Sequence, residues 1–275
     1  MTVSLGVHLP QYGRAAGAEA VSRCARQAEE LGLADVWVSD HLAVPAANPY
    51  PAPYLFEPII TLTWAAAATT TVGIGTSVLI GGYRRPLHLA KALATLDVLS
   101  AGRLTVGIGV GWTKEEFAGL GVPYDERGAR TDEAIDALRA CWEERPTNFT
   151  GASFELVDLV VLPQPTRRVP ILVGGSSAAA VQRAASKGDG WHGLGSPEQL
   201  APVAAAVRAL RPEPSFVLSA RTDWDGLATD ADVVRRQLDD YLELGFTHVV
   251  GVPAQRDLDS WLRSVEALHA IVTSR

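Results

Sequence analysis

The feature that most constrains the fold is a regular alternation of short apolar runs with helix-like segments along the whole chain. The apolar runs are continuous rather than alternating, as in parallel strands that are covered on both faces. We therefore expect a parallel sheet in which each strand is followed by a helix. Strands are predicted at residues 3–9, 35–39, 72–80, 104–109, 170–173, 190–194, 215–219 and 247–252.

The segments between these strands have helical character. Ala20, Cys24, Ala28 and Leu31 recur at helical spacing, and Gly32 follows at the point where a helix would end. Further helices are expected near residues 57–71, 86–99, 113–119, 125–144, 177–187, 197–211, 231–244 and 258–272.

Eight strand–helix units in one direction most simply close into a (β/α)8 TIM barrel, which places the chain in the α/β class. A doubly wound open sheet is the alternative, because it would tolerate a miscounted strand. No linker rich in Pro, Gly or Ser divides the sequence, so residues 1–275 are predicted to form a single domain. The least regular stretch, 145–169, is predicted to be a loop with a small hairpin, inserted before the fifth strand.

Charge and composition favour a soluble cytoplasmic protein. The formal net charge is −7, which disfavours a nucleic-acid groove because such grooves need clustered Lys and Arg. No signal peptide is expected, because the N-terminus lacks a charged region followed by an apolar run. No membrane span is expected, since Thr and Gly interrupt the apolar segment 59–82 throughout. Cys24 and Cys141 fall among apolar neighbours and are expected to be buried free thiols. Because ligand spacings of Cys and His are absent, no metal site is predicted.

In a barrel of this kind the active site lies at the C-terminal ends of the strands. The most informative such segment is 170–180 (PILVGGSSAAA), where a buried strand runs into Gly174, Gly175, Ser176 and Ser177 and then into a helix. The glycines let backbone N–H groups approach an anion, and the helix N-terminus adds partial positive charge. This pattern predicts a phosphate site. The alternative is an ordinary tight turn with a serine N-cap.

A second glycine-rich segment follows the fourth strand. Gly107, Gly109 and Gly111 have the spacing GxGxG, which does not complete a dinucleotide fingerprint. A glycine-lined wall is the better interpretation, because missing side chains leave room for a flat ring against the backbone. A glycine-rich strand end without a ligand is the alternative.

The pair Asp40-His41 directly follows the second strand and is predicted to supply an acid/base and its orienting carboxylate. The alternative is a helix N-cap beside a structural histidine. No GxSxG elbow is present, so a serine hydrolase is disfavoured. Strand-end positions also indicate residues of a substrate pocket, namely His8, Tyr12, Trp112, Trp191 and His192.

These same segments resemble the luciferase-like monooxygenase family, and in particular its branch that depends on the deazaflavin coenzyme F420. The likeness covers LGVHLPQYG, ELGLADVWVSDHL, VGIGTSVLIGGYRRPLHLAKALATLDVLSAGRLTVGIGVGW, KEEFAGLGVPYDERGARTDEAI, and PILVGGSS followed by GDGW. The third of these segments is the most specific. The resemblance implies a barrel with an insertion, usually a homodimer, and a deazaflavin or flavin (FMN) ring that lies across the barrel mouth.

The resemblance also assigns roles around the ring. Thr76, Ser77 and Val78 match the bulge behind the ring. That bulge often holds a non-prolyl cis peptide, which is expected here between Ser77 and Val78. Gly107 and Gly109 match the wall that faces the bulge.

The remaining roles concern the phosphate and the ring edge. The turn 174–177 would hold the phosphate, and Asp40 and His41 match residues near the ring edge, with His41 the best acid/base candidate. The chain departs from the sugar-phosphate dehydrogenase branch, which places a glutamate after the glycine run where this chain has Gly111-Trp112. We therefore do not expect oxidation of glucose 6-phosphate.

The leading functional hypothesis is an oxidoreductase that transfers a hydride between coenzyme F420 and an unidentified organic substrate. A reduced-FMN-dependent monooxygenase that uses oxygen is one alternative. A non-catalytic flavin-binding protein is another, although storage alone would not require the Asp40-His41 pair. The last alternative is a barrel that binds a sugar phosphate without any flavin.

Overall fold

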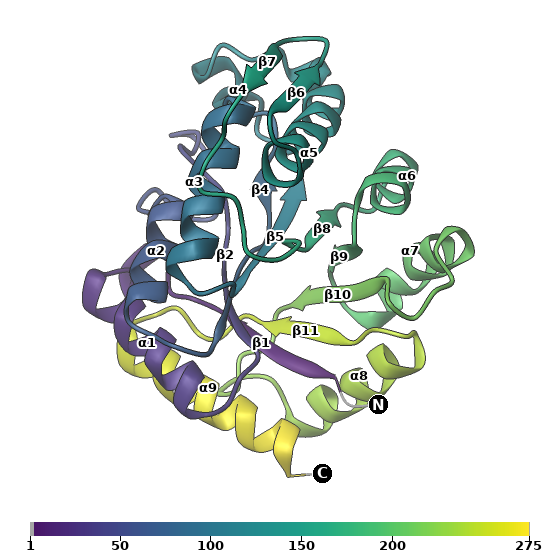
Figure 1. The fold of residues 1–275 in the computed structure, drawn as a ribbon. Helices are drawn as coiled ribbons and strands as arrows, with labels where there is room; N and C mark the ends of the chain where they lie inside the picture. Colours follow the sequence, from purple (N-terminus) through teal and green to yellow (C-terminus); the bar gives the residue numbers. More distant parts are fainter. Residues whose placement is uncertain (1–2, 275) are drawn as a thin grey trace.

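Parallel strands form a closed barrel whose order around the wall follows the chain. The computed structural model describes residues 3–274, and within this range eight strands make the ring. The barrel strands, shown in Figure 1, are β1 (Ser4–His8), β2 (Asp35–Val38), β3 (Gly73–Thr76), β5 (Leu104–Gly109), β8 (Ile171–Gly174), β9 (Gly190–Leu194), β10 (Val217–Thr222) and β11 (His248–Gly251). Because β1 pairs with β11 and β3 pairs with β5, the ring is closed. The TIM barrel prediction is confirmed, and the open doubly wound sheet is wrong.

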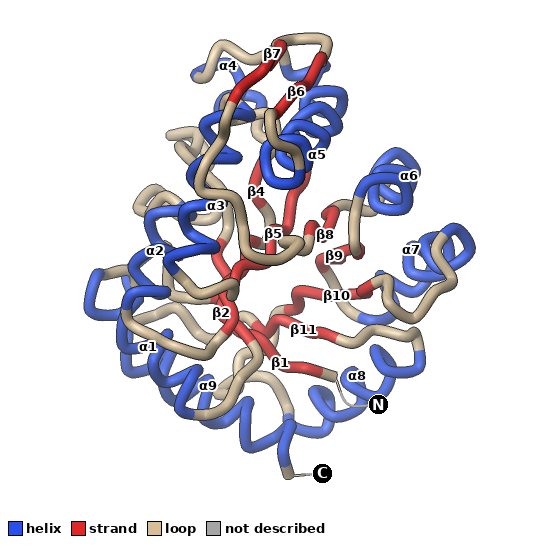
Figure 2. The backbone as a smooth tube through the Cα atoms, in the orientation of Figure 1, coloured by secondary structure: helices blue, strands red, loops and turns tan. Residues whose placement is uncertain are grey.

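Helices surround the barrel on its outer side, as Figure 2 shows. They are α1 (Ala18–Glu30), α2 (Pro58–Ala67), α3 (Pro86–Leu99), α4 (Lys114–Gly119), α5 (Arg127–Glu143), α6 (Ala178–Lys187), α7 (Pro197–Leu210), α8 (Ala231–Glu243) and α9 (Leu258–Thr273). Short 3-10 turns precede α1 and α5, at Gly13–Ala15 and Tyr124–Glu126. No helix within residues 3–274 is both long enough and apolar enough to cross a membrane.

Two predicted ends are displaced by three residues or more, and an arginine binds backbone carbonyls close to each element. α2 ends at Ala67 rather than at residue 71, and Arg103 binds the carbonyls of Ala66 and Thr69 at that end. The seventh barrel strand is predicted over 215–219 but runs from Val217 to Thr222. The turn before it is closed by Arg208, which binds the carbonyls of Glu213 and Phe216.

The third barrel strand is interrupted near the barrel mouth. One continuous strand is predicted over 72–80. The structure instead has β3, then Ser77 and Val78, then β4 (Leu79–Ile80), which pairs with β5. The peptide between Ser77 and Val78 is cis, as the family resemblance implied.

The insertion before the fifth barrel strand is confirmed. β6 (Thr147–Thr150) and β7 (Glu155–Leu159) form an antiparallel hairpin that lies outside the barrel sheet. In Figure 1 the hairpin stands beside α4 and α5, away from the barrel strands.

Apolar side chains pack in three clusters among the described residues, one of which comprises Ile80, Tyr83 and Phe117. Because successive strand residues point to opposite faces, Val36 and Val38 face the helices, where the larger core lies. Trp37 faces the barrel interior and packs there with Leu172 and Val250. One indole thus occupies much of an interior that branched aliphatic side chains usually fill.

Candidate active site

A cavity of about 830 Å³ opens at the barrel mouth, where barrel enzymes hold their active sites. Its volume is typical of small-molecule and cofactor sites. The predicted site residues that line it are Tyr12, Asp40, His41, Ser77, Val78, Gly109, Gly111, Trp112, Gly174, Gly175, Ser176, Trp191 and His192. The predicted site residues that lie outside its wall are His8, Thr76, Gly107 and Ser177.

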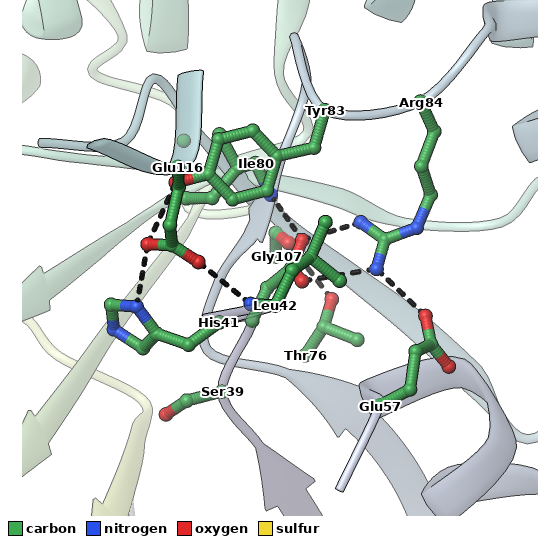
Figure 3. A network of polar contacts seen from close by, with 12 residues as sticks. Ser39, His41, Leu42, Glu57, Thr76, Ile80, Tyr83, Arg84, Gly107 and Glu116 are labelled. Carbon is green, nitrogen blue, oxygen red and sulfur yellow. Dashed lines mark hydrogen bonds and ion pairs between the residues drawn. The ribbon is translucent and has the colours of Figure 1, made fainter. Parts of the chain in front are cut away.

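His41 is held by a carboxylate from a distant segment, Glu116 of α4 (Figure 3). Its Nδ1 lies 3.0 Å from Glu116 Oε2, and the imidazole is 14% exposed whereas the carboxylate is buried. A carboxylate only accepts, so Nδ1 carries the hydrogen and donates it. The other ring nitrogen, Nε2, forms no hydrogen bond within residues 3–274, which leaves it for the cavity.

Glu116 accepts further hydrogen bonds that hold it in place. Its Oε1 accepts from the backbone N–H groups of Leu42 (2.6 Å) and Ala43 (3.2 Å), and its Oε2 accepts from the Tyr83 hydroxyl (3.0 Å). Burial raises the pKa of Glu116, but the hydrogen bonds from His41, Leu42 and Ala43 outweigh it and lower the pKa to about 2. Burial and the Glu116 charge raise the pKa of Tyr83, so its hydroxyl stays a donor.

Asp40 pairs with an arginine rather than with His41. Its Oδ2 accepts from Arg84 Nη1 (2.5 Å) and from the backbone N–H of Ile80 (2.9 Å). Its Oδ1 accepts from Arg84 Nη2 (3.0 Å), which also donates to Glu57 (2.7 Å). The bidentate guanidinium engages both oxygens of this buried carboxylate. The orienting carboxylate predicted for His41 is therefore not Asp40 in the structure.

Aromatic rings border the cavity beside His41. The Trp112 ring stands edge-on to the imidazole, with centroids 5.8 Å apart, and Tyr50 lies 6.2 Å from Trp112. Gly111 has a φ of +75°, and a Cβ there would fall 2.8 Å from Ile80 Cγ2. Only glycine fits this turn comfortably, and the turn brings Trp112, which is 56% exposed, to the cavity rim.

Glycines of β5 and β8 make room for the Val78 side chain. A Cβ on Gly109 would lie 2.7 Å from Val78 Cγ2, and a Cβ on Gly174 would lie 3.0 Å from its Cγ1. A Cβ on Gly107 would fall 1.9 Å from the carbonyl oxygen of Thr76, whose hydroxyl donates to Gly107 O (2.8 Å). The bulge itself therefore fills the space that the sequence assigned to a ring against the glycine backbone. A ring in the cavity would meet Val78 instead.

The turn between β8 and α6 has features suited to an anion. Gly175 adopts a φ of +111°, which L residues rarely adopt, and with Ser176 it lines the cavity. Ser177 caps α6 by accepting from the backbone N–H of Ala180 (3.2 Å). The cap satisfies one of the four unpaired amides at this helix end, and the preceding amides have no intrahelical partner. The serine cap and the anion site are therefore compatible here.

His8 lies behind the cavity wall in a polar cluster. Its Nδ1 donates to the Leu9 carbonyl (2.8 Å), and its Nε2 lies 2.9 Å from Ser39 Oγ. Burial lowers the pKa of His8 well below its ordinary value, and Arg221 lowers it further, so the ring is neutral. Arg221 Nη1 donates to Ser39 Oγ (2.7 Å) and to the Ser77 carbonyl (3.3 Å), and so connects this cluster to the bulge.

The family to which the chain belongs follows from a comparison of its sequence with known families. The luciferase-like monooxygenase family model matches residues 1–258. The chain belongs to this family. Membership confirms the predicted family, and the family together with its F420-dependent dehydrogenase relatives supports an oxidoreductase enzyme.

The luciferase-like chain is similar to proteins named as F420-dependent dehydrogenases and to proteins named as monooxygenases. An F420-dependent glucose-6-phosphate dehydrogenase of Kineococcus radiotolerans is 38% identical over 169 residues, which cover 60% of this chain and about half (49%) of that protein. A monooxygenase structure from Streptomyces bottropensis superposes with a TM-score of 0.80 at 21% identity and covers 97% of this chain and 98% of its own. The structure of an F420-dependent secondary alcohol dehydrogenase in complex with an F420–acetone adduct superposes with a TM-score of 0.78 at 20% identity. The superposition covers 98% of this chain and 99% of that chain.

Several site residues of this luciferase-like chain escaped the sequence reasoning. Tyr83, Arg84 and Glu116 lie in the segments GGYRRP and KEEF, which carry the family resemblance. Nothing in their spacing indicates that they meet residues 40–43. Arg221 lies beyond residue 219, the predicted end of its strand. It was therefore not among the strand-end residues that were expected to line the site.

Proposed function

We propose that this luciferase-like oxidoreductase transfers a hydride between the deazaflavin coenzyme F420 and a small organic substrate. The observation that carries the proposal is one cavity that joins the His41–Glu116 pair to the glycine–serine turn at the start of α6. A phosphorylated ring cofactor needs an anion site at one end and a proton-transfer group at the other. The similarity to two F420-dependent dehydrogenases supports the deazaflavin as the cofactor.

The residues of the turn fit the phosphate of such a cofactor. Gly174, Gly175 and Ser176 would hold it through backbone N–H groups and the serine hydroxyl, beside the positive end of the α6 dipole. Val78 would support one face of the ring. When bound, the deazaflavin supplies the carbon that accepts or donates the hydride, while the protein supplies binding and orientation.

His41 would move the proton that accompanies the hydride. Since Glu116 holds Nδ1–H, the lone pair on Nε2 can accept a proton from a substrate hydroxyl. The ionised Glu116 carboxylate stabilises the imidazolium that forms. In the opposite direction, the protonated ring returns the proton from Nε2. Tyr83 and the amides of residues 42–43 hold Glu116, so the ring orientation exists before substrate binds.

The cofactor assignment is tested by titrating purified apo-protein with oxidised F420 and, separately, with FMN. We expect tight and selective binding of F420, followed by its absorbance. Selective FMN binding with oxygen consumption would favour a reduced-FMN monooxygenase. A cofactor that binds but remains inert in turnover assays would favour a flavin-binding protein. Binding of neither coenzyme would overturn the proposal.

We expect no oxidation of glucose 6-phosphate, although a similar protein is named for it. Trp112 stands where that branch has a glutamate after the glycine run, and Glu116 is fully engaged by His41, Leu42 and Ala43. The check is F420 reduction with glucose 6-phosphate, with the Kineococcus enzyme as the positive control. Comparable turnover by both proteins would show this expectation to be wrong.

A further inference from the structure

A continuous chain of hydrogen bonds crosses the interior of the barrel from its mouth to its opposite end. At the mouth, Ser77 Oγ lies 2.8 Å from His192 Nε2, and His192 Nδ1 lies 2.8 Å from Ser219 Oγ. Ser219 Oγ also lies 2.8 Å from His248 Nδ1, and His248 Nε2 lies 2.8 Å from Asp35 Oδ1. His248 and Asp35 begin their strands, whereas Ser77 follows the end of β3. We call these five residues the Ser77–Asp35 relay.

The barrel interior is shaped around the relay. Trp37 stacks on His192 with centroids 5.1 Å apart and planes 5° apart, and its Nε1 donates to Asp35 Oδ1 (2.5 Å). A Cβ on Gly6 would fall 2.0 Å from Asp35 Oδ1, and a Cβ on Gly75 would fall 2.7 Å from the Trp37 ring. The absence of a side chain at Gly6 leaves space for the Asp35 carboxylate, and its absence at Gly75 leaves space for the Trp37 indole.

Most of the relay is shielded from water. His192 is 3% exposed and Ser219 is 0% exposed, whereas the side chain of Asp35 is 19% exposed at the far end. Burial, His248 and then Arg221 lower the pKa of His192 to about 3, so this ring is neutral at physiological pH. A neutral imidazole has one donor nitrogen and one acceptor nitrogen, so a donor on one side of the His192 ring requires an acceptor on the other.

The direction of hydrogen-bond donation along the relay is set at the carboxylate of Asp35. Asp35 Oδ1 accepts from the Trp37 indole, which only donates, and a carboxylate has no hydrogen to give. His248 Nε2 must therefore donate to Asp35. In a neutral His248 ring, Nδ1 is then an acceptor, and it takes the hydroxyl hydrogen of Ser219.

The same reasoning assigns the donor and the acceptor of each remaining hydrogen bond between Ser219 and the cavity. With its hydrogen given to His248, Ser219 can only accept from His192 Nδ1–H. His192 Nε2 is then the acceptor nitrogen, and it takes the hydroxyl hydrogen of Ser77. The Ser77 hydroxyl lines the cavity with its oxygen lone pairs and not with its hydrogen.

We propose that His248 carries a single hydrogen, on Nε2 toward Asp35, and that Asp35 is thereby a positioning residue that fixes Ser77, through the relay, as a hydrogen-bond acceptor toward the cavity. A molecule bound against Ser77 must then present a donor there, an N–H or an O–H group. A carbonyl oxygen or an unprotonated ring nitrogen at that point would face lone pairs and bind poorly. The inference rests on the proposed function in one respect, namely that the molecule is the ring cofactor on the bulge.

The direction of the relay is measured without any ligand by nitrogen-15 NMR of the protein labelled at histidine, near neutral pH. In the unmodified protein we expect His192 to carry its hydrogen on Nδ1 and His248 on Nε2. A His192 ring protonated on Nε2 would overturn the proposal, because Ser77 would then be free to donate into the cavity. This measurement needs no variant.

Variants test whether Asp35 sets the direction. Ser219→Ala removes the middle of the relay without touching the cavity, and Asp35→Ala removes its origin; both should shift His192 toward the Nε2-protonated form. Asp189→Ala is the matched control, since Asp189 lies just before β9, accepts from Ile171 and Arg139, and stands outside the relay. The control should leave both tautomers unchanged. An unchanged His192 tautomer in Asp35→Ala would refute the role of Asp35.

Binding then separates the relay from the cofactor assignment. With F420 and FMN as probes, Ser77→Ala and Ser219→Ala should each weaken the coenzyme that binds by roughly fivefold to tenfold, the loss of about one net hydrogen bond. Undiminished affinity in Ser77→Ala would remove Ser77 as an acceptor for the ring. If neither coenzyme binds the unmodified protein, the proposed function fails, while the tautomers still decide the direction of the relay.

Discussion

At the scale of residues, His41 receives its chemical character from Glu116, 75 positions later in the chain. The carboxylate sets which ring nitrogen carries the hydrogen, and it would stabilise positive charge on the ring. The neighbouring Asp40 instead fixes Arg84 and the start of β4. Two adjacent acid and base side chains therefore serve different partners.

Replacing His41 tests the proton transfer. In His41→Ala, turnover should fall by roughly 100-fold or more while the Kd for the cofactor stays nearly unchanged, because the ring acts on the proton and not on the phosphate. Steady-state kinetics and a binding titration measure the two effects. Unchanged turnover would remove His41 from the mechanism.

Replacing Glu116 tests the orientation of that ring. Glu116→Gln keeps the shape but loses the charge, so kcat should fall by roughly tenfold to 100-fold with little change in KM. Glu115→Gln is the matched control, because Glu115 is the exposed neighbour on the same helix. A raised KM at constant kcat would instead indicate that Glu116 contributes to binding.

At the scale of elements, two connections bring the ends of the cavity together. α4 follows the glycine-rich end of β5 and reaches back to the loop after β2. The turn from β8 to α6 presents a helix N-terminus at the same mouth. Both depend on glycines in strained or crowded positions, Gly111 and Gly175.

The turn before α6 is tested by Gly175→Glu. A side chain at φ of +111° is strained, its Cβ would lie 3.0 Å from Ala180 Cβ, and its charge repels phosphate, so cofactor binding should be lost. Gly17→Glu is the control, since Gly17 precedes α1 with an ordinary extended backbone and has an open surrounding. Normal cofactor affinity in Gly175→Glu would place the phosphate elsewhere.

At the scale of the whole molecule, the unusual property is a hydrogen-bonded polar chain inside the barrel, beside the apolar cluster of Trp37, Leu172 and Val250. His192, His248, Ser77 and Ser219 connect strands from both halves of the chain, where aliphatic layers are usual. Such a network stabilises the barrel only while every member keeps its partner, because an unpaired buried polar group is costly. Its stability should therefore depend on pH.

The pH dependence has a definite sign. The pKa of His192 is about 3 in the folded barrel, against an ordinary value of 6.5. Between these values the unfolded chain takes up a proton that the folded chain refuses. The free energy of unfolding should thus fall as pH is lowered through this window, by about 1.4 kcal/mol per pH unit for this group. Urea unfolding at several pH values measures the slope.

A variant tests whether His192 causes this pH dependence of the free energy of unfolding. His192→Gln has no titrating ring, so its unfolding free energy should depend less steeply on pH, by the contribution of one proton. His8 is buried with its pKa lowered in the same direction, so part of the slope remains. Equal slopes in the two proteins would show that His192 is not the group responsible.

The sequence alone determined the architecture and the location of the site. Apolar periodicity acts between near neighbours, so it predicts the barrel strands, the helices and the hairpin insertion from local patterns. The glycine–serine turn is likewise local, whereas the bulge at Ser77 and Val78 was expected only from the family resemblance; both line the cavity at the barrel mouth. Apart from the interruption after β3, the largest shift of a strand end is at β10, where Arg208 holds the preceding turn.

Only the tertiary structure decided which side chains became partners. Glu116 rather than Asp40 binds His41, Val78 fills the glycine wall, and a hydrogen-bond chain links Ser77 to Asp35. These contacts join segments far apart in the chain, and they depend on the stagger of neighbouring strands and on the reach of each loop. Local patterns carry no information on either quantity, because both arise only when the barrel closes.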